Sequence, residues 1–98
     1  MSKINLDIIR GFLATQPVVK AWLFGSFARG EEREDSDVDI LIQFDNKAKV
    51  GLLRHASIMT GLEDLLHRKV DLVTEGSLYP EIRPYVDADK ILIYERGS

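Results

Sequence analysis

Hydrophobic residues recur every three or four positions in two stretches of the chain, which is the spacing of amphipathic helices. The first stretch covers residues 3–14 and the second covers residues 52–66, where Gly61 weakens the helix only locally. A further short helix is expected from Pro80, and Pro84 either interrupts it or restarts it. The two long helices each offer one apolar face for packing on a core.

Four shorter apolar segments have the composition and the period of β-strands. They are residues 20–24, 38–44, 70–74 and 91–94. With the helices they give the order αβαβαβαβ, which includes two short helices. The expected fold class is α/β (α+β), a mixed sheet of about four strands flanked by helices. We expect the strand 38–44 to lie centrally with the strand 70–74 beside it, whereas the direction of the strand pairs stays open.

Two aspartates stand at the head of the expected central strand. Asp37 and Asp39 are separated by one residue, so their side chains project from the same face of the strand, about 7 Å apart. Two neighbouring carboxylates repel each other unless a cation lies between them. Because Mg²⁺ binds one or two carboxylates together with water and substrate phosphates, the pair predicts a site for Mg²⁺ or Mn²⁺ and a nucleoside triphosphate.

The preceding strand ends in a turn that is suited to phosphate. Gly25 lets the backbone approach a ligand closely, and Ser26 presents a hydroxyl and a backbone N–H at the start of a short helix over residues 27–29. The polar loop 31–36 then returns the chain to the carboxylate strand, and Ser36 is expected to cap that turn. The turn and the carboxylates therefore form one candidate site.

Two other motifs share letters with this region and are excluded. A P-loop needs Lys followed by Ser or Thr after its second glycine, but Glu31 and Glu32 stand there and would repel phosphate. An EF-hand loop that begins at Asp35 needs glycine at its sixth position and glutamate at its twelfth, where the chain has Ile40 and Asn46.

Residues 25–30 (GSFARG), 36–42 (SDVDILI) and 70–73 (VDLV) together resemble the signature of the minimal nucleotidyltransferases, the MNT family of the DNA polymerase β superfamily. The resemblance extends over most of the chain. It implies a polymerase-β-like nucleotidyltransferase core.

The resemblance also implies roles for individual residues. Asp37 and Asp39 would hold two Mg²⁺ ions, and Asp71 would ligate the first ion or activate the acceptor hydroxyl. Gly25 and Ser26 would bind the triphosphate.

Basic residues are candidates for contacts with a substrate or a partner. Arg29 lies in the first motif and is a further candidate for nucleotide binding, although such an arginine more often pairs with a carboxylate, here Glu32 or Glu34. A second basic cluster, residues 67–69 with residues 54–55, fits a solvated helix end better than a site for RNA or an acidic partner.

Length and composition limit what the chain does alone. Its 98 residues form one domain over 1–98, in which a second domain for gripping base and acceptor cannot fit. Part of the site is therefore expected from a partner or from a second copy of the chain. The net charge of −3 disfavours autonomous binding of nucleic acid. Without cysteine, signal peptide or apolar span, we expect a cytoplasmic protein with no membrane contact.

The resulting hypothesis is Mg²⁺-dependent transfer of a nucleoside monophosphate, AMP from ATP, to a hydroxyl. MNT proteins are often paired with a HEPN-domain toxin, so the resemblance implies a tyrosine of such a partner as the acceptor and an antitoxin role. Two alternatives stay open: a non-catalytic module that binds nucleotide or occludes its partner, and transfer to a small molecule or an RNA end. The intact carboxylates argue against the first alternative, and the acidic charge argues against RNA.

Overall fold

The computed structural model describes residues 4–97, which form four helices, one 3₁₀ turn and four strands. In chain order they are α1 (Leu6–Leu13), β1 (Val18–Phe24), α2 (Ser26–Arg29), β2 (Val38–Phe44), α3 (Leu52–Leu66), β3 (Val70–Thr74), the 3₁₀ turn η1 (Glu75–Ser77), α4 (Arg83–Asp89) and β4 (Ile91–Glu95). The predicted order of helices and strands is confirmed, and η1 is an addition that the sequence did not predict.

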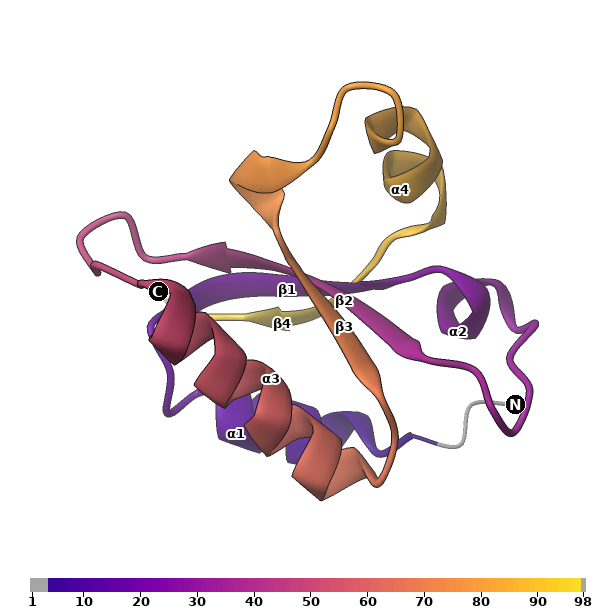
Figure 1. The fold of residues 1–98 in the computed structure, drawn as a ribbon, viewed down its shortest axis with the longest axis horizontal. Helices are drawn as coiled ribbons and strands as arrows, with labels where there is room; N and C mark the ends of the chain where they lie inside the picture. The colour runs from indigo at the N-terminus through magenta and orange to yellow at the C-terminus, as the bar shows by residue number, and fades with distance from the viewer. Residues whose placement is uncertain (1–3, 98) are drawn as a thin grey trace.

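The four strands form one mixed sheet in the order β3-β2-β1-β4 (Figure 1). Strand β1 runs antiparallel to both β2 and β4, whereas β2 runs parallel to β3. Strand β2 therefore lies inside the sheet with β3 beside it, as predicted. Helix α3 makes the crossover connection that a parallel pair requires.

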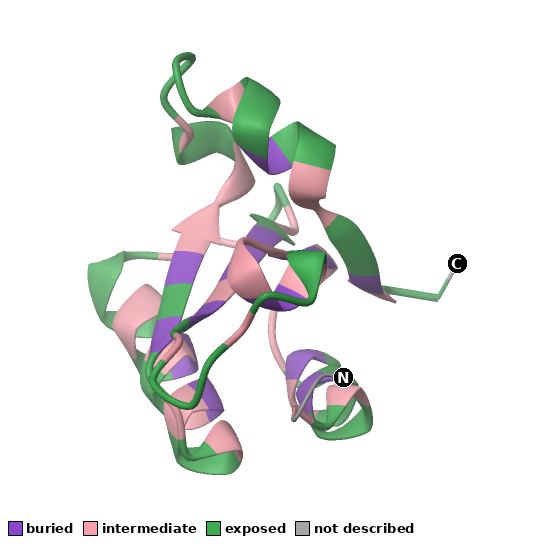
Figure 2. Cartoon of the chain, turned by 90° about the vertical axis from the view of Figure 1, so that its right-hand side faces the viewer, coloured by how far each residue is buried: buried purple, intermediate pink, exposed green. Residues whose placement is uncertain are grey.

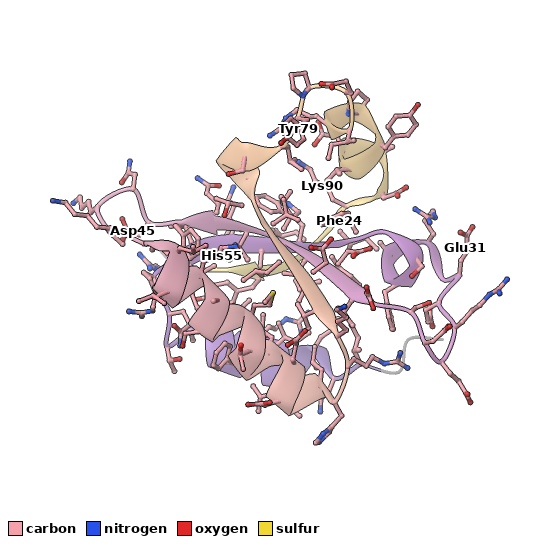
Figure 3. The ribbon with its side chains drawn as sticks, viewed as in Figure 1. Phe24, Glu31, Asp45, His55, Tyr79 and Lys90 are labelled. Atoms are coloured by element: carbon pink, nitrogen blue, oxygen red, sulfur yellow. The ribbon has the colours of Figure 1, made fainter. Side chains whose placement is uncertain are left out.

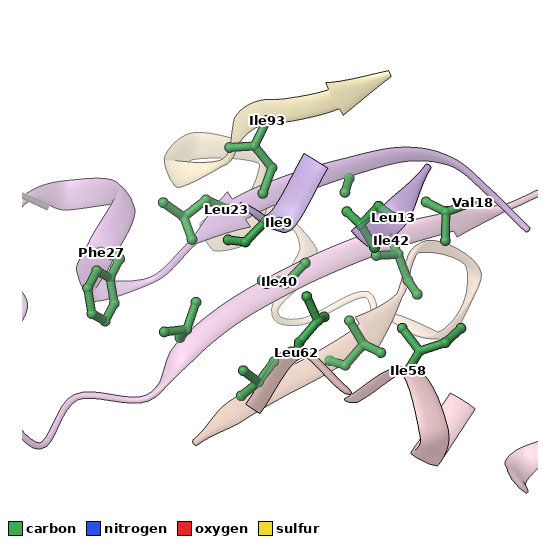
Figure 4. Close-up of a cluster of buried hydrophobic side chains, with 14 residues drawn as sticks. Ile9, Leu13, Val18, Leu23, Phe27, Ile40, Ile42, Ile58, Leu62 and Ile93 are labelled. Atoms are coloured by element: carbon green, nitrogen blue, oxygen red, sulfur yellow. The ribbon is translucent and has the colours of Figure 1, made fainter. Parts of the chain in front are cut away.

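Helices α1 and α3 cover one face of the sheet, and α4 lies on the other side (Figure 1). The main core lies between the sheet and the first two of these helices (Figure 4). Alternate residues of β2 point into this core, so the residues between them point to the opposite face. The core side chains include Ile9, Leu13, Val18, Leu23, Phe27, Ile40, Ile42, Ile58, Leu62 and Ile93.

The first helix begins later than predicted. Residue 3, its expected start, lies outside the described residues, and residues 4 and 5 are not helical. Helix α1 begins at Leu6 because the side chain of Asn5 accepts hydrogen bonds from two backbone N–H groups of the first turn.

The sequence left open whether Pro84 interrupts or restarts the short helix expected from Pro80, and the start of α4 answers this question. The helix begins at Arg83 with Pro84 in its first turn, where the missing N–H of proline costs nothing. The chain at Pro80 is a turn and not a helix, so the predicted helix start there is wrong.

Burial follows this layered arrangement. Exposed residues lie on loops and on the outer sides of the helices, whereas buried residues lie mainly on the strands and on the inner sides of the helices (Figure 2). Within residues 4–97, no helix has both the length and the apolar character needed to cross a membrane.

Candidate functional site

Asp39 and Asp71 lie directly opposite each other on the parallel strands β2 and β3. Residues paired in this way point to the same face of a sheet, so both carboxylates project from the face opposite α1 and α3. Asp37 lies just before β2; it and Asp71 are exposed, while Asp39 is half-buried. The structure thus brings the three predicted carboxylates to the same end of the parallel strand pair.

The environment of Asp39 disfavours its charged form. The pKa of this carboxyl is raised from 3.8 to about 6, first by burial and then by the negative charges of Asp71 and Asp37, while the positive charge of Arg29 opposes the shift. A divalent cation among these groups would offset the repulsion, and carboxylate oxygens suit Mg²⁺ or Mn²⁺.

The three carboxylates do not form a complete metal cage. Within residues 4–97, no three His, Cys, Asp or Glu side chains are arranged so that they could hold a metal ion. Mg²⁺ commonly takes one or two carboxylates and completes its coordination with water and substrate phosphates. The residues present fit a cation of that kind, whose coordination would be completed by water and phosphate oxygens.

Gly25 lies against the carboxyl group of Asp39. Its backbone has φ 75° and ψ −152°, a conformation that glycine alone adopts without strain. A Cβ atom at this position would overlap Oδ2 of Asp39 and lie 3.1 Å from its Cγ. The contact arises because Phe24, the residue before Gly25, is paired with Asp39 across β1 and β2.

Ser26 is the first residue of α2, for which Gly25 serves as the N-cap. No group in the described part of the chain hydrogen-bonds to its hydroxyl. The helix ends after one turn at Gly30, which has φ 72°, and the N–H of Glu31 donates to the carbonyl of Ser26 at 2.9 Å. The single turn is therefore closed by its own backbone, and the hydroxyl is available to a phosphate oxygen.

Arg29 forms ion pairs with Glu31 and Asp89, and not with Glu32 or Glu34 as predicted. The left-handed glycine that follows Arg29 turns the chain so that the next side chain lies beside the guanidinium, and the end of α4 supplies the second carboxylate. Hydrogen bonds to Glu31 and then Asp89 raise the pKa of Arg29 above its ordinary value. The role of Arg29 in nucleotide binding stays a prediction.

Ser36 closes the loop before the carboxylates, as predicted. Its hydroxyl accepts the backbone N–H of Arg33 at 2.7 Å, and its own N–H donates to the Arg33 carbonyl at 3.1 Å. Arg68, which we expected to be solvated at the end of α3, instead donates to carbonyl groups of this loop, so that expectation is wrong for Arg68. No local pattern in the sequence predicts that Arg68 donates to this loop, because Ser36 and Arg68 are 32 positions apart.

A separate hollow of about 440 Å³ lies at the other end of β2. It is lined by Phe44, Val50, Gly51, Leu52, His55, Thr74 and Ser77. Figure 3 shows the separation: Asp45 and His55 lie at one end of the sheet, whereas Phe24, which pairs with Asp39, lies toward α2 at the other end. The carboxylates therefore form an open surface site that is distinct from this hollow.

Related sequences indicate the family of this chain. Residues 6–93 match the family model of the nucleotidyltransferase domain. A protein of Methanocaldococcus jannaschii that carries the provisional name protein adenylyltransferase is 38% identical over 72 residues, which cover 72% of this chain and 72% of that protein. Protein adenylyltransferase MntA of Thermococcus cleftensis is 48% identical over 56 residues, or 57% of this chain and 54% of that protein.

Solved structures share the fold. A structure provisionally named a minimal nucleotidyltransferase is 38% identical and has a TM-score of 0.71, covering 93% of this chain and 98% of that chain. A toxin–antitoxin crystal structure with AMP-PNP has a TM-score of 0.81 and covers 95% of this chain and 75% of that chain; at 21% identity it shows likeness of fold alone. These findings confirm the resemblance to minimal nucleotidyltransferases. The chain therefore belongs to the nucleotidyltransferase domain family.

Proposed function

We propose that this chain is a Mg²⁺-dependent nucleotidyltransferase that moves AMP from ATP to a tyrosine hydroxyl of a HEPN-type partner toxin and so acts as its antitoxin. The observation that carries the proposal is the position of Asp39, opposite Asp71 on the neighbouring strand and against Gly25 of the turn before Ser26. Nucleotidyl transfer needs carboxylates and phosphate-binding groups in such close proximity, because it depends on positioning and on neutralisation of charge.

The carboxylates are the residues that would hold two Mg²⁺ ions, or Mn²⁺ in their place. When bound, these ions neutralise the triphosphate and lower the pKa of the acceptor hydroxyl. The chain keeps Asp37, Asp39 and Asp71 close together although burial, and then their mutual repulsion, raise the pKa of Asp39 to about 6. We assign Asp71, exposed on the edge strand, to the side of the site that the acceptor hydroxyl approaches.

Gly25 and Ser26 bind the triphosphate in this proposal. The first N–H groups of a helix lack partners within the helix, and the Ser26 hydroxyl has none among residues 4–97. Both can therefore donate to phosphate oxygens. Arg29 contributes positive charge beside the site from its place between Glu31 and Asp89.

The assignment of the acceptor rests on relatives. The related proteins described above are named protein adenylyltransferases, one of them provisionally, and one solved structure with this fold is a complex of a tri-AMPylated HEPN toxin of Shewanella oneidensis with an MNT antitoxin. Asp37 and Asp71 are exposed, so a hydroxyl on a second protein can reach them. We infer that the acceptor half of the site lies on another chain, and that the reaction takes place in the cytoplasm, where ATP is present.

The test is to incubate the protein with ATP, Mg²⁺ and its co-expressed partner and to measure intact masses. We expect AMP adducts on the partner, and we expect Asp39→Asn to fold normally and to lose about 10²- to 10³-fold in transfer rate. Asp64→Asn is the control, because Asp64 is an exposed aspartate on α3 without an ion pair in the described structure.

Other results would redirect the assignment. A stable complex without adducts would indicate an occluding module, and turnover only with an added small molecule or RNA end would indicate a different acceptor. Wild-type transfer by Asp39→Asn would contradict the proposed chemistry itself.

A further inference from the structure

Arg68 contacts the loop 31–36, which directly precedes Asp37 and β2. Its Nη1 atom donates to the carbonyl oxygens of Glu34 at 2.9 Å and Ser36 at 3.2 Å, and a longer contact of 3.4 Å reaches the carbonyl of Arg33. A charged donor shared among several backbone carbonyls restrains a loop more strongly than a neutral one does. The approach of the chain to Asp37 is therefore restrained by a side chain from the segment that follows α3.

The same guanidinium also contacts the phosphate-binding half of the site. Its Cζ atom lies 5.1 Å from the ring centroid of Phe27. Phe27 is only 4% exposed and directly follows Ser26 in α2. A cation over a buried ring is partly desolvated, which strengthens its attraction to the ring. Arg68 thus links the helix that begins with Ser26 to the loop that ends at Asp37.

The backbone beside Arg68 is itself held in place. His67 has a left-handed conformation with φ 53°, which ends α3 and turns the chain toward β3. The carbonyl of Lys69 accepts the N–H of Val38 at 2.9 Å, so β2 and the segment after α3 are bonded next to the site. The backbone that carries the Arg68 side chain is therefore restrained on both sides.

We propose that Arg68 is a positioning residue, which holds Asp37 and Ser26 at a set separation through the loop carbonyls and the ring of Phe27. Its consequence for catalysis rests on the proposed function, whereas the restraint of the loop is a property of the chain itself. A guanidinium suits this task because its planar group donates in several directions while its face stacks on a ring. A lysine ammonium cannot do both.

Two variants and one matched control test the proposal. Arg68→Met keeps an unbranched stem against Phe27 and removes every donor, and Arg68→Lys keeps the charge but loses the planar group. Arg54→Met is the control, since Arg54 is an exposed arginine near the start of α3 whose guanidinium makes one long hydrogen bond, 3.3 Å to Gln16, within the described residues.

The first measurement is amide hydrogen exchange at Ser36 and Val38 in the protein alone. The second is the affinity for Mn²⁺ in the presence of a non-hydrolysable ATP analogue. In Arg68→Met we expect exchange about tenfold faster and Mn²⁺ binding about tenfold weaker, with intermediate values in Arg68→Lys and wild-type values in Arg54→Met.

Recovery of activity with added Mn²⁺ is a readout that a purely structural role would not change. With ATP and the partner, kcat/KM of Arg68→Met should fall by about 10- to 100-fold and recover in part as Mn²⁺ is raised. A loss of stability alone would not respond to the metal while the protein stays folded.

Wild-type exchange at Ser36 and Val38 together with wild-type Mn²⁺ affinity in Arg68→Met would overturn the proposal. If that variant does not fold, Arg68→Lys decides: smaller changes in both quantities support the proposal, and wild-type values overturn it. If the wild-type protein transfers no nucleotide, the proposed function fails, but the exchange result still tests the role of Arg68 in holding the loop.

Discussion

The carboxyl group of Asp39 occupies the space in which a side chain at position 25 would begin. The sequence predicts that the backbone approaches phosphate at Gly25. The structure adds that the backbone also approaches a carboxylate there, in a conformation with φ 75° that other residues adopt only under strain. Any larger residue at this position therefore disturbs the turn and Asp39 together.

We expect Gly25→Ala to lower the free energy of unfolding by about 2 kcal/mol, because alanine is strained in this conformation and its Cβ collides with Asp39. Binding of Mn²⁺ with an ATP analogue should weaken as Asp39 is displaced. Urea unfolding and Mn²⁺ titration measure the two effects. Gly11→Ala is the control. Gly11 lies in α1, and an added Cβ would have no atom from beyond its own stretch of helix within 4 Å, so the free energy of unfolding should rise by up to about 1 kcal/mol. Unchanged Mn²⁺ binding in Gly25→Ala would show that Asp39 is not displaced.

Candidate residues were predictable where their chemistry lies in a short stretch of sequence. Asp37 and Asp39 are separated by one residue in the chain, so their spacing alone predicts a shared face. The partners of Arg29 were predicted wrongly because one of them, Asp89, is 60 positions away. The contacts of Arg68 were not predicted for the same reason, because they join residues that are far apart in the chain.

Among the helices, α1 and α3 meet where Gly61 faces the ring of Phe12. A Cβ atom at position 61 would lie 2.6 Å from Cζ of Phe12. The sequence predicted Gly61 only as a local weakness of the helix. In the structure the missing side chain makes room for a ring of the neighbouring helix, so the lost helix propensity is offset by packing.

Helix propensity alone predicts that Gly61→Ala raises the free energy of unfolding by about 1 kcal/mol. We expect it instead to lower the free energy of unfolding by about 1 kcal/mol, because the ring of Phe12 must move. In a Phe12→Leu background the same change should be neutral or stabilising. Urea unfolding of the four proteins of this double-mutant cycle measures a coupling of about 1–2 kcal/mol. Additive effects would show that the two side chains do not compete for space.

The centres of the elements were more predictable than their ends. Periodicity reports which face of a helix or strand is buried, and α3, β2 and β3 even have the predicted bounds. By contrast α1, β1 and α4 begin at Leu6, Val18 and Arg83, and not at residues 3, 20 and 80 as predicted. The region between β3 and α4 was predicted wrongly, because its structure depends on a contact between two short elements. Arg83 at the start of α4 pairs with Glu75 of η1 at 3.0 Å and also donates to the Glu75 carbonyl at 2.8 Å.

For the whole molecule, the balance of charge is acidic, with 16 acidic and 13 basic residues. The ion pairs among residues 4–97 lie at partly or fully exposed sites, where each contributes little to stability. Asp39 differs because it is half-buried and has two like charges nearby. Its protonation therefore affects the stability of the whole fold.

The pKa of Asp39 in the folded protein, about 6, lies above the ordinary value of 3.8, so the folded state holds this proton more tightly than the unfolded chain does. Its contribution to the free energy of unfolding is fully present below pH 4 and is lost as the pH rises through 6. Allowing for access of water to the carboxyl, we expect a loss of about 1–2 kcal/mol.

Urea unfolding of the wild type and Asp39→Asn, with a chelator present, isolates this effect. The wild-type free energy minus that of the variant should fall between pH 4 and pH 7. With Mg²⁺ and an ATP analogue the trend should reverse, because the cation binds the deprotonated carboxylate. A difference that does not vary with pH would mean that the pKa of Asp39 is not raised.

The amino-acid sequence by itself determined the order of the helices and strands, the class of fold, the family and the identity of the aspartates, because each depends on patterns within short stretches of the chain. Only the tertiary structure decided which distant residues meet: the directions of the strand pairs and the place of β4 beside β1, Asp71 opposite Asp39, Gly25 against Asp39, and Arg68 on the loop. The physical reason is that spacing along the chain sets the face on which a side chain lies, whereas its partner depends on the direction and register of strand pairing, and many pairings are compatible with the same local pattern.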